Sequence, residues 1–350
     1  MEIDYLLNHL LNFDLIWELI RNNNIMDIIE SVSKYSNIEV NILANIGMGG
    51  YSKGKSSGNY YYVLSDLKEN LIHYQWLEKK LADDRSKEVY LNLLRFRILP
   101  NFDFLKMAYD KDHDQYFDHK IVQCDENEIF VDCGGYIGDT VESFINNYKL
   151  FNKIYTYEPS RENINKSKEV IIKYNSIILR PYGVGTTEDH ISFIDSGSSS
   201  SFMGKDDESS DKINITSLDL DILEPVSFIK MNIEGFEIDA LIGAKHHIIN
   251  EKPKLAICVY HLISDIWEIP RLILAMNCDY KLYLRHYRED QNWETVIYAI
   301  PPQKHQSTLR IQSNDNLNVY SINGDAGYWT NQQLTKDCGI IPYLFYKHFG

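Results

Sequence analysis

The sequence has few cysteines, no long apolar run and no excess of basic residues. Its five cysteines are odd in number and scattered without metal or redox spacing, which favours a reduced, cytoplasmic protein. No apolar run approaches the length of about 18 residues that a transmembrane helix needs, so no membrane span is expected. The first twenty or so residues form an amphipathic, acidic segment without the basic lead of a secretion signal.

The charge balance is acidic. Asp and Glu outnumber Lys and Arg by 50 to 35, which gives a formal net charge of -15. This balance argues against nucleic acid or an anionic membrane surface as the main partner. A chain of 350 residues can form one large domain or two modest ones. Tyrosine is abundant, at 25 residues, which suits a hydroxylated ligand such as a saccharide and equally suits packing. A homo-oligomer is compatible with the sequence.

Residues 128–159 read in order as strand, glycine turn, helix, strand and acid. Apolar runs at 129–131 and 154–157 have the β-branched and aromatic character of buried strands. Residues 140–150, between them, place apolar side chains at helical spacing. Parallel strands joined by a helix bind ligands at the carboxyl ends of the strands, so this unit predicts a ligand site.

Acids mark both strand ends. Asp132 ends the first run, and Glu158, followed by Pro159, ends the second. Glu158 lies about 20 residues beyond the glycine turn, where a carboxylate can accept hydrogen bonds from both hydroxyls of a ribose. Gly134 and Gly138 allow close approach of the backbone to a ligand, and a helix that begins near Gly138 offers unpaired N–H groups to an anion.

The spacing of the glycines distinguishes between two classes of nucleoside-like ligand. A dinucleotide turn needs G-x-G-x-x-G, but Tyr136 stands where that spacing, counted from Gly134, requires the second glycine. The pattern D-x-G-x-x-x-G, headed by Asp132, resembles the turn of methyltransferases that use S-adenosylmethionine (SAM). SAM carries an ammonium and a sulfonium, so acids near the turn suit it. Dinucleotide binding and a plain βαβ unit with a tight turn are the alternatives.

Two later strands also end on polar residues. The run 228–231 is followed by Asn232 and Glu234, and the run 255–260 by His261. These residues are expected to face the same crevice. Methyl transfer to oxygen requires the acceptor to be aligned and its proton removed. Histidine titrates near neutrality, so His261 is the candidate base, whereas Glu234 can orient it, bind the acceptor hydroxyl or act as the base itself. Alternatively, both residues serve only to cap neighbouring elements.

The order of elements predicts an α/β fold with a seven-stranded, doubly wound, Rossmann-like sheet of the class I methyltransferase type. Five strands alternate with helices, and an antiparallel pair at 281–287 and 295–300 closes the sheet. Residues 1–115 are mainly helical and are expected to form a cap on the substrate side. Residues 116–301 form the expected SAM-binding domain, and 302–350 form an extension without a readable pattern.

The sequence also contains several weaker patterns. Residues 49–56 match the phosphate-loop pattern G-x-x-x-x-G-K-[ST], but glycine and asparagine at 58 and 59 interrupt the required helix, so a mobile loop is the better interpretation. Residues 196–211 are polar and of low complexity, which predicts a linker or a flexible lid. Residues 190–195 alternate like an edge strand, and residues 236–249 have helical spacing. No ligand spacing indicates a metal site, although a Mg²⁺ site formed by Glu234 and aspartates stays open as an alternative.

The segments VDCGGYIGDT, YEPSRENINK, FIKMNIEGFEIDALIGA and KPKLAICVYH, in this order, resemble the successive motifs of the FkbM family of SAM-dependent methyltransferases. The resemblance covers about residues 116–301. It implies a seven-stranded SAM-binding fold and O-methylation of a hydroxyl on a saccharide, a sugar nucleotide or a related natural product. Many members of the family belong to surface-polysaccharide or natural-product pathways.

The resemblance also implies roles for individual residues. The expected cofactor-binding residues are Asp132, Gly134, Tyr136, Gly138, Asp139, Thr140, Glu158, Pro159 and Asn163. The expected catalytic residues are His261, Glu234 and Asn232. One position departs from the family motif I-K-x-D-x-E-G, because Asn232 stands where the motif has Asp. Asparagine keeps the shape and hydrogen bonding of aspartate but loses its charge. A non-catalytic SAM-binding or interaction protein is therefore one alternative function, and phosphate or nucleotide binding through residues 49–56 is another.

Overall fold

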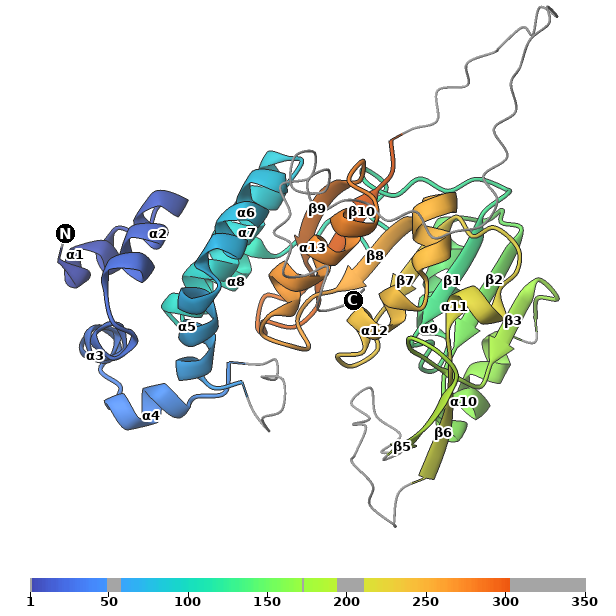
Figure 1. The fold of residues 1–350 in the computed structure, drawn as a ribbon, viewed down its shortest axis with the longest axis horizontal. Helices are drawn as coiled ribbons and strands as arrows, with labels where there is room; N and C mark the ends of the chain where they lie inside the picture. The colour runs from blue at the N-terminus through green and yellow to red at the C-terminus, as the bar shows by residue number, and fades with distance from the viewer. Residues whose placement is uncertain (1, 49–57, 172, 194–210, 303–350) are drawn as a thin grey trace, which may run out of the picture.

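A seven-stranded sheet organises the fold (Figure 1). The computed structural model describes residues 2–48, 58–171, 173–193 and 211–302. The parallel strands are β1 (Ile129–Cys133), β2 (Lys153–Tyr157), β3 (Ile177–Arg180), β7 (Phe228–Met231) and β8 (Lys254–Cys258). The hairpin of β9 (Lys281–His286) and β10 (Thr295–Ile300) adds to β8 through antiparallel β10. The order β3-β2-β1-β7-β8-β10-β9 confirms the predicted doubly wound sheet.

Both faces of the central strands are buried, which is why these strands read as continuous apolar runs. Successive side chains point to opposite faces. Val131 and Ile229 therefore pack into one apolar cluster, whereas Phe130 and Phe228 pack into another. The ring of Phe130 stacks on Phe144 of the following helix, with centroids 4.4 Å apart. This packing fixes β1 and β7 side by side and so sets the position of their carboxyl ends.

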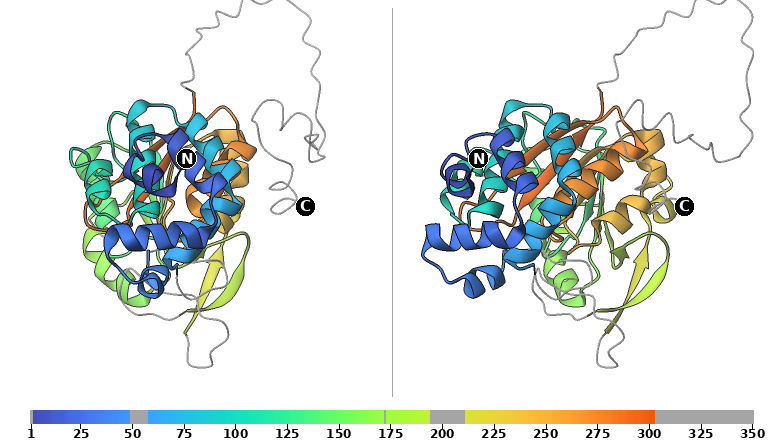
Figure 2. Two further views of the ribbon diagram at one scale, coloured as in Figure 1. Left: turned by 90° about the vertical axis from the view of Figure 1, so that its left-hand side faces the viewer. Right: turned by 60° about the vertical axis from the view of Figure 1, so that its left-hand side comes forward.

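Helices cover the two faces of the sheet (Figure 2). They are α9 (Asp139–Asn147), α10 (Arg161–Ile171), α11 (Leu218–Asp221), α12 (Glu237–Ile242), α13 (Asp265–Met276) and the π-helical turn η1 (His247–Glu251). The single helix predicted over 236–249 is wrong, because the chain leaves the α-helix after Ile242. The backbone of Gly243 passes so close to Gly185 that a Cβ atom at Gly243 would lie 2.0 Å from the Gly185 carbonyl oxygen.

A second, three-stranded sheet lies beside the first. Its strands are β4 (Gly183–Val184), β5 (Asp189–Phe193) and β6 (Asp211–Thr216), in the order β4-β6-β5. The strands β3 and β4 are separated near Pro181, which has no N–H to offer to a ladder. The edge strand predicted at 190–195 belongs to this small sheet, and β6 was not predicted. Residues 49–56, nearly all of 196–211 and all but the first residue of 302–350 lie outside the described residues.

The amino-terminal region is helical, as predicted. Its helices are α1 (Ile3–Asn8), α2 (Phe13–Asn22), α3 (Ile25–Ser36), α4 (Val40–Asn45), α5 (Tyr60–Glu69), α6 (Leu71–Lys80), α7 (Asp84–Ile98) and α8 (Asp103–Ala108). Side chains cap three of them: Asn12 accepts a hydrogen bond from the Leu15 N–H, Asn59 from the Tyr62 N–H, and Asp83 from the Ser86 N–H. None of the described helices is long and apolar enough to span a membrane.

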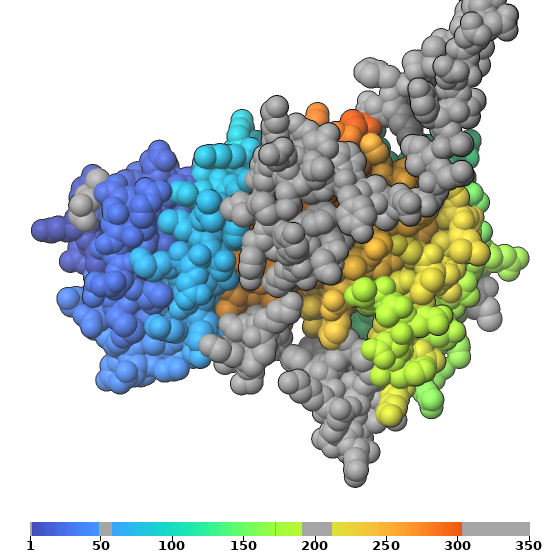
Figure 3. Space-filling view, in the orientation of Figure 1, coloured from blue at the N-terminus to red at the C-terminus, as the bar shows by residue number. Residues whose placement is uncertain are grey.

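These helices extend the molecule beyond the β9 edge of the sheet. The Ala82 N–H donates a hydrogen bond to the Leu282 carbonyl, and Asp83 forms an ion pair with Arg285 at 2.8 Å. The apolar core is continuous from α1 to the sheet. In the space-filling view the amino-terminal helices occupy one end of the molecule and the small sheet lies toward the other (Figure 3). The helical region thus packs against the β9 edge of the sheet and supports it.

Candidate active site

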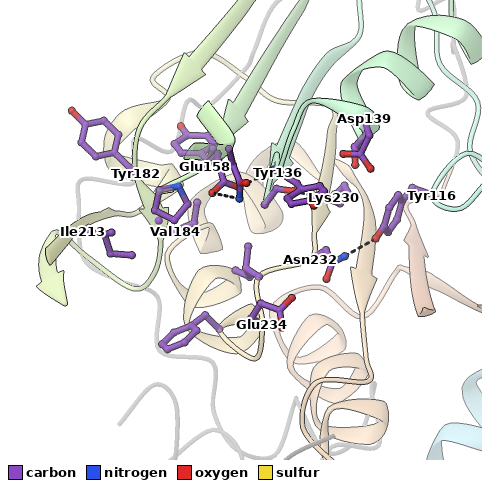
Figure 4. Close-up of a pocket in the computed structure, with 18 of the residues that line it drawn as sticks. Tyr116, Tyr136, Asp139, Glu158, Tyr182, Val184, Ile213, Lys230, Asn232 and Glu234 are labelled. Carbon is purple, nitrogen blue, oxygen red and sulfur yellow. Dashed lines mark hydrogen bonds between the residues drawn. The ribbon is translucent and has the colours of Figure 1, made fainter. Parts of the chain in front are cut away.

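A cavity of about 290 Å³ lies beside the carboxyl ends of β1, β2 and β7 (Figure 4). This is the place where an open parallel sheet binds ligands. Most of the residues predicted from the sequence line it: Gly134, Tyr136, Asp139, Thr140, Glu158, Pro159, Asn163, Asn232 and Glu234. The structure does not place Asp132, Gly138 or His261 on the cavity wall. Of the described residues up to position 115, only Gln115 lines the cavity.

The glycine turn forms one wall. Gly134 has φ +86°, and a Cβ atom there would lie 2.0 Å from the Asn232 carbonyl oxygen, so no other residue fits. The N–H groups of Gly134 and Gly135 both donate to the carbonyl of Tyr157. Gly138, with φ +88°, immediately precedes α9. The turn is therefore held between β2 and β7, with its backbone against the cavity.

Glu158 is fixed by the same turn. Its Oε2 accepts a hydrogen bond of 2.8 Å from the Tyr136 N–H, and its Oε1 accepts one of 2.8 Å from the Ser160 N–H and a longer one from Asn163. Burial raises the pKa of Glu158, and these hydrogen bonds oppose the effect by favouring the carboxylate. Oε2 accepts only one of these hydrogen bonds, so it keeps a lone pair for a ligand hydroxyl, and a second hydroxyl can replace the long bond from Asn163 to Oε1.

Asp132 forms a buried ion pair. Lys230 Nζ lies 2.8 Å from Asp132 Oδ1 and 2.9 Å from the Gly134 carbonyl oxygen. Both side chains are at most 2% exposed, and the Lys230 ammonium lies 5.1 Å from the ring centroid of Tyr116. Lys230, and not Asp132, lines the cavity. Lys230 was not among the predicted site residues, although a lysine within the apolar strand FIKM indicates a buried charge partner.

Backbone strain is concentrated around this cavity. Among the described non-glycine residues with positive φ, four line it: Tyr116, Tyr136, Glu234 and Glu294, at +72°, +44°, +58° and +60°. Such a conformation costs on the order of 1–3 kcal/mol per residue and persists only where the surroundings impose it. Tyr116 and Glu294 were not predicted as site residues, because neither follows a parallel strand.

Glu234 rests on two further residues beneath the cavity. The Glu237 carboxylate accepts hydrogen bonds from the N–H groups of Ile233 and Gly235, on either side of Glu234. His261 Nδ1 lies 2.9 Å from Glu237 Oε1, and its Nε2 lies 3.9 Å from Glu234 Oε2. Glu237, also missed from the sequence, thus holds both the strained backbone of Glu234 and the ring of His261.

The pKa values of His261 and Glu234 determine the charges of their side chains. Burial alone would lower the pKa of His261, but the Glu237 carboxylate outweighs it and raises the pKa to about 9. His261, whose side chain is 4% exposed, is therefore a fixed cation at neutral pH. Burial raises the pKa of Glu234 to about 7, against the attraction of His261. The acid that faces the cavity is thus the one poised to exchange a proton near neutrality.

Asn232 joins two tyrosines. Its Nδ2 donates to the Tyr116 hydroxyl and its Oδ1 accepts from the Tyr260 hydroxyl, each at 3.1 Å (Figure 4 shows the first bond). Both ends of the amide are thereby used, which fixes its orientation. The neutral side chain at this position is integrated into the wall of the cavity.

Two groups of the described residues have metal-ligating atoms close together: Asp110, His113 and Asp118, and Glu237, His261 and Asp265. The second group lies beneath Glu234. Its carboxylates already accept backbone hydrogen bonds, Asp265 from the Leu262 N–H. We therefore assign this group to the support of Glu234.

Residues 132–282 match the family model of the methyltransferase FkbM domain. Among solved structures, the chain is similar to methyltransferase FkbM from Methylobacillus flagellatus KT, with 28% identity and a TM-score of 0.60. The match covers 68% of this chain and 62% of that one.

Two further solved structures are more distant. An rRNA methylase from Streptococcus thermophilus has 14% identity and a TM-score of 0.33, over 59% of this chain and 96% of that one. The putative methyltransferase SMU.1697c from Streptococcus mutans, in complex with SAH, has 13% identity and a TM-score of 0.34, over 52% and 93%. A search of curated proteins finds no significant match.

Proposed function

Because residues 132–282 form a methyltransferase FkbM domain, we propose that the chain transfers the methyl group of SAM to a hydroxyl of a saccharide, a sugar nucleotide or a related natural product. One observation carries this proposal. Glu158 and Glu234 line different sides of a single cavity (Figure 4). Glu158 is placed to bind a ribose, and Glu234 has a pKa of about 7.

The residues of the cavity fit SAM. Glu158 would accept hydrogen bonds from the ribose hydroxyls, and the glycine turn gives the ligand room against the backbone of Gly134. Asp139 and Glu158 give this part of the wall a negative charge, which suits a cofactor that carries an ammonium and a sulfonium. When bound, SAM supplies a methyl group that its sulfonium has already activated.

The protein's own contribution is to orient the acceptor and to take its proton. In the ionised form, Glu234 accepts the proton of the acceptor hydroxyl. Glu237 holds the backbone of Glu234, and the cation of His261 stabilises its ionised form. His261 thus acts as a positioning residue in this proposal, and Glu234 is the base, which was the alternative expected from the sequence.

Glu158→Ala should weaken SAM binding by roughly tenfold to a hundredfold, because each charge-assisted hydrogen bond is worth about 1.5–3 kcal/mol. Isothermal titration calorimetry measures the change. Glu162→Ala is the matched control, since Glu162 lies close by on α10 but is 56% exposed and pairs only with a surface lysine in the described structure. Equal affinities for the two variants would remove Glu158 from the cofactor site.

The reaction itself is tested with SAM that carries a trideuterated methyl group. The protein is incubated with a panel of free saccharides and sugar nucleotides, and the products are analysed by mass spectrometry. A trideuteromethyl ether on a hydroxyl supports the proposal. SAM binding without transfer to any hydroxyl of the panel would favour the non-catalytic function that the neutral Asn232 suggests.

A further inference from the structure

We propose that Glu294 is a second acceptor-side carboxylate of this cavity, and that with Glu234 it selects an acceptor whose reacting end carries no phosphate. This inference rests on the proposed function and narrows it, because it favours free saccharides over sugar nucleotides. Glu294 lines the cavity but has no part in the cofactor site described above.

The closing hairpin brings Glu294 to this edge of the sheet. β10 runs antiparallel to β8, so the start of β10 lies beside the carboxyl end of β8, where Val296 pairs with Cys258. Glu294 immediately precedes β10, and its carbonyl accepts a hydrogen bond from the Tyr287 N–H across the hairpin. Its φ of +60° is the left-handed conformation, which costs energy for a glutamate.

Hydrogen bonds tie Glu294 to Asn232. Its Oε2 accepts from the Gln115 amide and, at 3.4 Å, from the Tyr260 hydroxyl. The same hydroxyl lies 3.1 Å from Asn232 Oδ1. Because one hydroxyl has one proton, Tyr260 cannot donate fully to both oxygens, and one of them can accept a hydrogen bond from a ligand hydroxyl. Among the described residues, both hydrogen bonds to the carboxylate end on Oε2, so Oε1 can also accept from the ligand.

The charges of the wall decide which ligand fits. Asn232 is neutral, so Glu294 supplies the negative charge on this side of Glu234 and raises its pKa. The described wall has one basic side chain, Lys230, and Asp132 neutralises it. A phosphate placed between Glu234 and Glu294 would therefore meet two carboxylates and no free cation from the described wall, which is a repulsive selection against it. An uncharged or aminated saccharide meets no such repulsion.

The test compares glucosamine with glucosamine 6-phosphate, which differ only in the phosphate. Dissociation constants are measured by NMR titration on the SAH-loaded full chain. The wild type should bind glucosamine roughly tenfold or more tightly than its phosphate. Glu294→Gln should narrow this ratio, and Glu294→Lys should reverse it. Glu289→Gln, which removes the same charge from an exposed position on the hairpin, should leave the ratio unchanged.

Equal or tighter binding of the phosphate by the wild type would overturn the inference. The inference would also be overturned if the Glu294 variants did not change the ratio of the two dissociation constants, or if neither sugar bound. SAH binding is measured first on every sample. Failure of the wild type to bind SAH would count against the proposed function itself. If the wild type binds SAH but binds the two sugars equally, only the role of Glu294 is removed.

Discussion

Glu234→Gln is expected to lower kcat by roughly 10²- to 10⁴-fold, the usual contribution of a positioned general base, and to leave SAM affinity unchanged. Glutamine keeps the shape of the side chain but cannot accept the proton of the acceptor hydroxyl. Glu234 faces the cavity, has a pKa of about 7 and is held by Glu237 and His261, whereas His261 is protonated and lies off the wall. The loss should therefore fall on turnover.

The pH profile gives the same variant a second readout. Only ionised Glu234 accepts a proton, so wild-type kcat/KM should rise through pH of about 7 and level off above it. His261→Gln removes a cation that lowers the pKa of Glu234, so the rise should move to higher pH. Asp239→Asn removes an exposed charge on α12 and should change neither kcat/KM nor the pH at which it rises. Near-normal turnover by Glu234→Gln across the pH range would assign the base to another group.

Lys230→Met is expected to lower the free energy of unfolding by about 3–5 kcal/mol, because it leaves the Asp132 carboxylate buried without its cation. The Lys230 and Asp132 side chains are 2% and 0% exposed, so water cannot replace the lost contact. The substitution also removes the hydrogen bond to the Gly134 carbonyl, which ties β7 to the glycine turn. Weaker SAM binding should accompany the loss of stability.

Chemical denaturation of three variants checks this prediction. Lys106→Met removes an exposed ion pair with Asp103 and should leave the free energy of unfolding almost unchanged. The double variant Lys230→Met, Asp132→Asn removes both buried charges and should recover most of the stability lost in the single variant. If Lys230→Met were as stable as the wild type, the pair would not be what holds the turn.

The parallel strands made part of the site predictable. Glu158, Asn232 and Glu234 all follow apolar runs, and the carboxyl ends of parallel strands meet at one edge of the sheet. The same rule placed His261 at that edge, since it follows β8. It could not show that the ring turns beneath Glu234 and pairs with Glu237, because the direction of a side chain after a strand depends on tertiary packing.

The site residues that were not predicted do not follow parallel strands. Tyr116 comes from the segment before β1, and Glu294 from the turn before an antiparallel strand, so no strand-end rule applies to them. Lys230 lies inside a strand, where its burial is explained only by Asp132 on the neighbouring strand. These positions depend on contacts between distant parts of the chain, which periodicity and local spacing do not encode.

Calorimetric titration of the purified chain with SAH, NAD and ATP tests the central claim most directly. The expected result is micromolar binding of SAH at one site per chain, weakened by Glu158→Ala, with no comparable binding of NAD or ATP. Failure of a folded chain to bind SAH, or preferential binding of NAD, would contradict the assignment of this cavity to SAM.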